Sequence, residues 1–455
     1  MRLSSLAALA LFALFALFAF VAHARAQPAT QELSLEDAVR LALAHDPRVI
    51  GAAAEHERRR ADAAVIRGRL LPNVDFEQAF VRTDQAVAVF GTRLLQGRFR
   101  ETDFALPALN DPNAITDHAS TLRVEVPLVH VEGWLGARAA RALSRGAHAD
   151  VRLRELEVAA SVIRLYHQVV LAETSASVAE EAATAARADA ERIRSMYAHG
   201  AATELDVLEM DVHLATLDER VIAARGDAAS VRAALHHAIG LPLDTPLRLV
   251  TELASIDDAP SVDAAQITLD DHPTVARARH TEEAARIARR ASRARFAPVL
   301  AAAGELQSHR ASLGADAAHG ESYVLGVVLR LNLFRGLQDL ASTRAADALS
   351  DAAHADAVWS ESAVRTQIRR AQIAVESAHA RLDVATQAVG LAQRALQTQR
   401  HRLENGLGDT ASLVRARTAL LDAEQRRLVS FHAERLAHVD LAVALGDSAL
   451  GEMPR

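Results

Sequence analysis

The sequence predicts a mainly α-helical chain that also carries four β-strands, arranged as two copies of one unit. Gly200 and Gly406 lie 206 positions apart, and a long run with helical apolar periodicity follows each glycine. Two pairs of prolines repeat at an offset of 226 positions: Pro47 with Pro273, and Pro72 with Pro298. A repeat of this length sets the architecture, so each copy is expected to contain a helix, a strand, a loop, a second strand and a long helical hairpin.

Residues 1–26 have the pattern of a secretory signal peptide. Arg2 is followed by an apolar run from Leu6 to Ala22, and Ala24-Arg25-Ala26 offers small residues for cleavage. A retained membrane anchor is the alternative, but the run is at the short end for a spanning helix and no cationic cluster follows it. We therefore expect cleavage after Ala26 and no transmembrane helix elsewhere.

Composition excludes several classes of protein. The chain has no cysteine, so an exported form has neither a disulfide nor the cysteine that anchors a bacterial lipoprotein. All 51 cationic side chains are arginine, the formal net charge is −7, and both signs are interspersed. This distribution is not that of a nucleic-acid-binding protein.

The first copy is expected over residues 27–240, with its helical hairpin over 133–240. No proline occurs between Pro127 and Pro242, and apolar residues alternate at steps of three and four in both limbs. A continuous helix over residues 133–197 would extend roughly 97 Å at about 1.5 Å per residue. Such a length suits a coiled coil that spans a gap rather than a compact domain.

The four predicted strands alternate apolar and polar residues over about ten positions each. They cover residues 73–81, 121–131, 298–308 and 323–334. This is the pattern of membrane β-barrel strands, although a soluble sheet with one wet face would also produce it. Four strands cannot close a barrel. A membrane location would therefore require several chains.

The remaining segments connect these elements. Residues 241–266 contain three prolines and several acids and are expected to link the copies. The second copy covers residues 267–446, with a hairpin over 336–446 whose apolar seam is interrupted by Arg427 and Glu434, and residues 447–455 form a tail. The loop over residues 84–119 is much longer than its counterpart in the second copy, and long loops are usually external or functional.

The signal peptide, the two copies and the order Tyr-x-x-Gly then Asp-Val-Leu around Gly200 resemble the TolC-like outer-membrane efflux factor family over essentially the whole mature chain. The resemblance implies a homotrimer with a twelve-stranded barrel in the bacterial outer membrane. A coiled-coil barrel of helices would continue it through the periplasm. It also implies docking to a periplasmic adaptor (membrane fusion protein) and an inner-membrane pump of the RND or ABC type, as an exit duct for efflux or type I secretion.

The resemblance assigns roles to the hairpin ends. Gly200, Ala201, Gly406 and Leu407 would contact the adaptor, although a helix that turns back needs glycine in any case. The family carries gate aspartates six and nine residues after the second glycine, where this chain has Ser412 and Arg415.

In the first copy the same offsets hold Asp206 and Glu209, and Tyr197 matches a constriction tyrosine that the family has in its second copy. A ring of these carboxylates would favour cations. Alternatively, Thr203-x-x-Asp206 is a capping box at the start of a helix.

No sequence pattern indicates catalysis, a cofactor or a metal. The 20 histidines include one adjacent pair, His236-His237, without a metal-binding motif, and we expect them to be scattered over the surface. The alternative function is a periplasmic coiled-coil adaptor, but such proteins have one hairpin and a β-rich head rather than two hairpins alternating with strands.

Overall fold

The computed structural model describes residues 31–243, 245–250, 269–314, 319–405 and 407–446, which fall into two compact units. Unit 1 contains residues 1–51, 152–272 and 363–455, and unit 2 contains residues 52–151 and 273–362. The predicted signal peptide, most of the predicted linker, the C-terminal tail and Gly406 lie outside the described residues. Helices α3 (Pro47–Gly68), α6 (Val131–Ala198) and α9 (Gln338–Glu404) contribute to both units.

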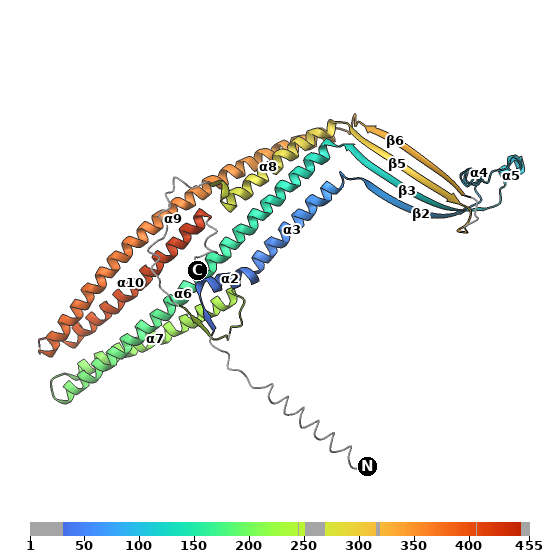
Figure 1. The fold of residues 1–455 in the computed structure, drawn as a ribbon. Helices are drawn as coiled ribbons and strands as arrows, with labels where there is room; N and C mark the ends of the chain where they lie inside the picture. The colour runs from blue at the N-terminus through green and yellow to red at the C-terminus, as the bar shows by residue number, and fades with distance from the viewer. Residues whose placement is uncertain (1–30, 244, 251–268, 315–318, 406, 447–455) are drawn as a thin grey trace, which may run out of the picture. The chain divides into compact units, whose positions relative to one another are not determined.

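Unit 2 is built on one antiparallel sheet in the order β2-β3-β5-β6 (Figure 1). Its strands are β2 (Asn73–Thr83), β3 (Ile115–Val129), β5 (Val299–Arg310) and β6 (His319–Arg330). The register aligns Phe76, Leu122, Leu306 and Tyr323 in one row and Asp75, Arg123, Glu305 and Val324 in the next. Adjacent rows point to opposite faces. The sheet therefore has one apolar face and one face that carries its charges.

All four strands differ somewhat from their predicted bounds, and the largest differences are in β3 and β6. β6 ends at Arg330 rather than at 334, because Arg330 pairs with Val299, the first residue of β5, and Pro298 before it cannot donate a ladder hydrogen bond. β3 begins at Ile115 rather than at 121, because β2 continues to Thr83 and pairs with it. The polar residues of 115–120 conceal this extension from a pattern based on apolar alternation.

The connection from β2 to β3 is helical. It contains α4 (Ala86–Leu95), the 3₁₀ helix η1 (Glu101–Phe104) and α5 (Leu106–Asn110). Phe99 lies edge-on to both Phe90 and Phe104, with ring centroids 4.8 and 5.0 Å away. The amide of Gln96 is fully buried and donates to the Asp117 carboxylate at 2.9 Å. These contacts fix the long predicted loop against the end of the sheet.

Unit 2 also contains α8 (Pro273–Arg293) and the 3₁₀ helix η4 (Ala294–Phe296) beside parts of α3, α6 and α9. Both α3 and α8 begin at a proline, and each leads into a strand. Proline is well tolerated at a first helical position because its nitrogen needs no partner there. The element order of the first copy is thus found again in the second.

Unit 1 contains two helical hairpins, in which α6 runs beside α7 (Glu204–Ala238) and α9 runs beside α10 (Thr410–Leu445), as Figure 1 shows. Ion pairs cross each hairpin, such as Arg225 Nε to Glu180 Oε1 at 2.7 Å and His379 Nδ1 to Glu434 Oε1 at 2.6 Å. Glu434 thus has a partner at its seam position, and Arg427 is exposed. Among the described residues, no helix has the length and apolar character required to cross a membrane.

The largest core of unit 1 surrounds a small parallel sheet of β1 (Gln31–Leu33) and β4 (Leu247–Leu249), next to α2 (Leu35–His45). The Tyr166 hydroxyl lies 3.1 Å from the Leu33 carbonyl and 3.0 Å from the Val250 carbonyl, and burial raises the pKa of Tyr166 to about 12. A short 3₁₀ helix, η3 (Leu269–Asp271), precedes α8. This core packs α2 and the strands β1 and β4 against the middle of α6.

Candidate functional site

The end of the first hairpin is a tight turn that requires glycine. Gly200 has φ +72°, which residues with a Cβ rarely adopt, and no other atom would contact a Cβ there within 4 Å. The Ala201 amide donates to the Met196 carbonyl at 2.8 Å, and the Gly200 amide donates to the Tyr197 carbonyl at 3.0 Å. This pair of bonds satisfies the last carbonyls of α6. The glycine is therefore explained by backbone geometry.

The end of the second hairpin repeats the same bond. The Leu407 amide donates to the Arg402 carbonyl at 2.8 Å, and both residues lie 206 positions after their counterparts Ala201 and Met196. A Cβ on Gly408 would lie 2.8 Å from the Leu403 backbone nitrogen, so only glycine fits there. The side chain of Leu407 is 73 % exposed. Both hairpin ends therefore present small or apolar residues at their surface.

Asp206 forms a capping box at the start of α7. The Thr203 hydroxyl accepts from the Asp206 amide at 3.3 Å, and the Asp206 carboxylate accepts from the Thr203 amide at 2.8 Å and from its hydroxyl at 2.6 Å. Two amides that lack helical partners are satisfied in this way. The capping interpretation of Asp206 is thus correct, and the proposed gate role has to be compatible with it.

Asp206 also lies near the second hairpin. Its pKa is lowered below the usual value, first by the hydrogen bonds from the Thr203 side chain and amide, and further by the side chain of Thr410, the first residue of α10. The Asp206 carboxylate is therefore held in its ionised form by neighbouring donors.

The start of α10 uses the same two chemical groups, a carboxylate and a hydroxyl, in the opposite order. The Asp409 carboxylate accepts from the Ser412 amide at 2.7 Å and from its hydroxyl at 2.8 Å. These bonds lower the pKa of Asp409. Arg415 donates to the Ser412 hydroxyl at 2.7 Å, and its guanidinium lies 3.9 Å from Asp409. The second end thus pairs its carboxylate with a cation.

The two other predicted gate residues are accessible to different degrees. Glu209 lies half-buried on α7, one turn after Asp206. Tyr197 is 49 % exposed near the end of α6. Its counterpart in the second copy, Leu403, instead packs against a small core formed by Ala190, Ile193 and Met210. Asp206 and Glu209 therefore lie on one helix, and Tyr197 precedes the turn that leads into it.

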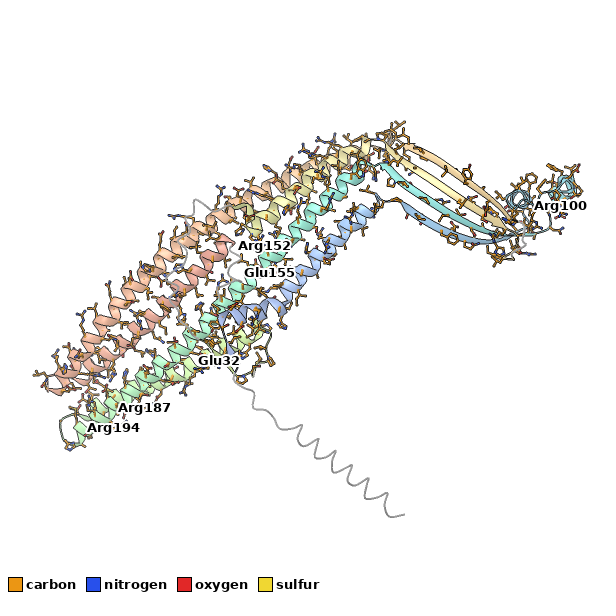
Figure 2. The ribbon with its side chains drawn as sticks, viewed as in Figure 1. Glu32, Arg100, Arg152, Glu155, Arg187 and Arg194 are labelled. Atoms are coloured by element: carbon orange, nitrogen blue, oxygen red, sulfur yellow. The ribbon has the colours of Figure 1, made fainter. Side chains whose placement is uncertain are left out.

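A buried ion pair between the hairpins was missed at the sequence level. Asp189 on α6 and Arg417 on α10 are 5 % and 14 % exposed, and Arg417 Nε lies 2.7 Å from Asp189 Oδ2. The exposed pairs Arg187–Asp218 and Arg194–Asp211 hold α6 to α7 nearby (Figure 2). Charged residues on both helices gave no sign of which pair is buried, because burial depends on the contact between hairpins.

The histidines do not form a metal site among the described residues. His236 is buried rather than on the surface, with Nδ1 2.7 Å from the Arg232 carbonyl and Nε2 2.9 Å from the Thr245 carbonyl. His272 and His432 are also buried. The expectation that the histidines are scattered over the surface is therefore wrong for these three, because the helix packing encloses them.

Comparisons with known proteins show which family this chain matches. The profile of the family described as outer membrane efflux protein matches residues 38–241 and 264–447. The alkaline protease secretion protein AprF of Pseudomonas aeruginosa is 24 % identical over 446 residues, which are 93 % of this chain and 89 % of AprF.

Two crystal structures have a similar fold. The outer membrane protein VceC from Vibrio cholerae has a TM-score of 0.75 and 18 % identity, covering 90 % of this chain and 96 % of VceC. The CmeC outer membrane channel of Campylobacter jejuni has a TM-score of 0.75 and 16 % identity, covering 90 % of this chain and 85 % of CmeC. The matches extend over the strands and both hairpins together.

Proposed function

The chain belongs to the outer membrane efflux protein family, so it is an outer-membrane export channel and not an enzyme, and we propose that three copies form the exit duct of a tripartite efflux or type I secretion system. The family match over both copies excludes the single-hairpin adaptor as an alternative. AprF is described as a secretion protein, and CmeC as a channel. Their descriptions support a channel that serves secretion or efflux.

The observation that carries the proposal is the four-stranded sheet. Its apolar face is exposed, with Phe76 at 68 % and Tyr323 at 74 %, and β2 and β6 are edges that pair with one strand each. Unpaired edges and an exposed apolar face are both unfavourable in water. Three sheets joined edge to edge would give twelve strands, place the apolar face in lipid and leave no open edge.

The hairpin ends would form the periplasmic end of this duct. Asp206, Glu209 and Tyr197 are proposed as the gate, and the surfaces around Gly200, Ala201, Gly406 and Leu407 as the contact with a periplasmic adaptor. The exposed side chain of Leu407 supports such a contact, since an apolar residue at a helix end gains by being covered. An inner-membrane pump of the RND or ABC type would supply the solute.

The mass of the protein after extraction from native membranes tests the assembly. Light scattering of detergent-extracted protein, corrected for bound detergent, should give three chains. A variant with Val324→Pro should extract as smaller species, because proline removes one backbone hydrogen-bond donor from the edge strand β6 and disturbs its pairing. A stable monomer from both proteins, with no larger species after crosslinking in membranes, would contradict the proposal.

A further inference from the structure

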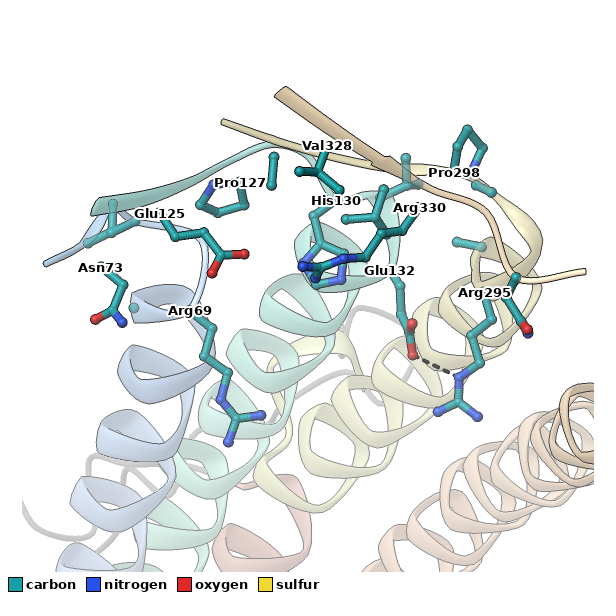
Figure 3. A pocket seen from close by; sticks show the side chains of 18 of the residues that line it. Arg69, Asn73, Glu125, Pro127, His130, Glu132, Arg295, Pro298, Val328 and Arg330 are labelled. Carbon is teal, nitrogen blue, oxygen red and sulfur yellow. Dashed lines mark hydrogen bonds and ion pairs between the residues drawn. The ribbon is translucent and has the colours of Figure 1, made fainter. Parts of the chain in front are cut away.

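A hollow of about 700 Å³ lies within unit 2, where the strands meet the helices. Its walls come from the end of α3, the start of α6, the segment after α8 and the adjoining ends of all four strands. Figure 3 shows Arg69, His130, Arg295 and Arg330 around this space. The hollow therefore draws its lining from both copies of the repeat.

The register of the sheet shows which face opens on the hollow. Asn73 pairs with Glu125, and Val299 pairs with Arg330, and all four line the hollow. Glu125 stands in a row next to Val124, which belongs to the apolar face, so the hollow lies on the opposite, charged face. In a membrane barrel the charged face points inward. On the proposed function, the hollow therefore opens into the duct.

Cations outnumber anions in this lining. Four arginines stand against two glutamates: Arg69, Arg295, Arg330 and Arg335 against Glu125 and Glu132. Glu132 is already engaged, since its Oε1 lies 2.8 Å from Arg295 Nε (Figure 3). Arg335 Nη1 lies 4.0 Å from Asp339 Oδ1.

Arg69 and Arg330 are different, because neither has an ion-pair partner among the described residues, and both are exposed. Glu125 lines the hollow as well, but no ion pair joins it to either arginine. A guanidinium group has donors in a planar fork that matches the oxygens of a carboxylate or phosphate. Two such groups on one hollow would recognise oxyanions.

We propose that the hollow is an anion-binding station inside the duct, where Arg69 and Arg330 bind carboxylate or phosphate groups of the exported solute. This inference rests on the proposed function, which places the charged face in the lumen. A station of this kind concentrates anionic solute at the join of barrel and helices. Binding has to be weak enough for release, and exposed side chains at the wall of a wide space meet that condition. Glu125 opposes binding and would limit its strength.

The test uses the full-length trimer in planar bilayers, with inorganic phosphate as the free anion and a short oligo-aspartate peptide as the model of an acidic polypeptide. Phosphate should reduce the ionic current of the unmodified channel. Arg69→Gln with Arg330→Gln should weaken this block about tenfold or more, because two charge-assisted contacts are lost. Glu125→Gln should strengthen it. Block by phosphate alone indicates small anions, and a stronger block by the peptide indicates acidic segments.

Two matched variants separate charge in the hollow from other effects. Arg69→Lys with Arg330→Lys keeps both charges and should retain most of the block. Arg40→Gln with Arg248→Gln removes two exposed arginines that do not line the hollow and should leave the block unchanged. If the glutamine variant conducts normally and phosphate blocks it as well as before, the anion station is wrong. If the unmodified protein forms no channel, the proposed function fails instead.

Discussion

The two hairpin ends have the same backbone and different charge. Each closes with a bond from an amide to a carbonyl five residues earlier, at positions related by an offset of 206. Each return helix is capped by a hydroxyl and a carboxylate three residues apart. In the first copy the order is Thr203 then Asp206, and in the second it is Asp409 then Ser412. Capping is therefore conserved between the copies while the carboxylate has moved by one turn.

This shift changes what surrounds the carboxylate. Asp206 receives hydrogen bonds from the amide and hydroxyl of Thr203 and has Glu209 one turn beyond it. Asp409 instead lies near the guanidinium of Arg415. A helix start needs one acceptor for its free amides, and either order supplies it. The backbone thus constrains the pair of residue types, and the position of the negative charge is free to serve another purpose.

The buried ion pair between the hairpins has no equivalent at the matching positions of the other copy. The positions equivalent to Asp189 and Arg417 by the same offset are Ala395 and Asp211. They cannot form a second ion pair, and Asp211 pairs with Arg194 in its own hairpin. The copies therefore share an architecture, but only the contact between α6 and α10 has a buried charge pair at these positions; the equivalent positions on α9 and α7 do not.

The largest expected effect comes from breaking that contact. Arg417→Met leaves the Asp189 carboxylate buried without its partner and should lower the free energy of unfolding by about 3–5 kcal/mol. Arg220→Met removes an exposed pair with Asp422, 3.5 Å apart between α7 and α10, and should cost about 0–1 kcal/mol. Denaturant unfolding of the trimer in detergent measures both. Equal losses would show that the Asp189–Arg417 pair is no more important than a surface contact.

An intermediate effect is expected from acid at a position where the two copies differ. His432 on α10 is 2 % exposed, and burial, His167 and Arg435 lower its pKa from 6.5 to about 4. Between pH 6.5 and about pH 4, the unfolded chain therefore binds a proton at His432 that the folded chain does not bind. The contribution to stability is complete above pH 6.5 and is lost as the pH falls from 6.5 toward 4. The first copy has Gly226 at this position.

His432→Gln removes this titration and should flatten the fall in melting temperature between pH 6.5 and pH 4. His199→Gln, at an exposed site near the end of the first hairpin, serves as the control and should keep the slope of the unmodified protein. An unchanged slope in His432→Gln would assign the acid sensitivity to other groups. Scans at several pH values within this window provide the measurement.

The regular parts of the molecule were predictable because they repeat or alternate. The strands follow from period-two patterns and the hairpins from long runs without proline, and α9 and α10 together lie within the hairpin expected over residues 336–446. The end of β6 was wrong because Leu331 and Leu333 continue the alternation after the partner strand has begun. Strand ends depend on the neighbour, which one sequence segment does not contain.

The site residues were predictable where local chemistry decides them. Thr203 and Asp206 are three residues apart, so their capping bond follows from sequence alone. Asp189 and Arg417 are 228 residues apart, and Arg69 and Arg330 come from different copies. Nothing in the spacing of these residues indicates that they meet. Their arrangement depends on the packing of the two copies against each other within each unit.

The last prediction concerns ion selectivity and expects the smallest change in stability. Asp206→Asn with Glu209→Gln keeps the size of both side chains and an acceptor for the bonds from Thr203, while removing two negative charges from each of three chains. A carboxylate ring should confer cation preference, so the double variant should shift the reversal potential in a salt gradient toward anions.

Asp409→Asn is the matched control at the other end, where Arg415 already offsets the charge, and it should leave selectivity nearly unchanged. Thr203→Ala removes a cap and should cost about 1 kcal/mol without altering selectivity, because both carboxylates remain. If Asp206→Asn with Glu209→Gln keeps the original selectivity and only melts earlier, Asp206 is a helix cap alone and the gate assignment is wrong. A shift in reversal potential in this double variant, and in neither control, would show that the carboxylates of α7 set the charge of the narrow end.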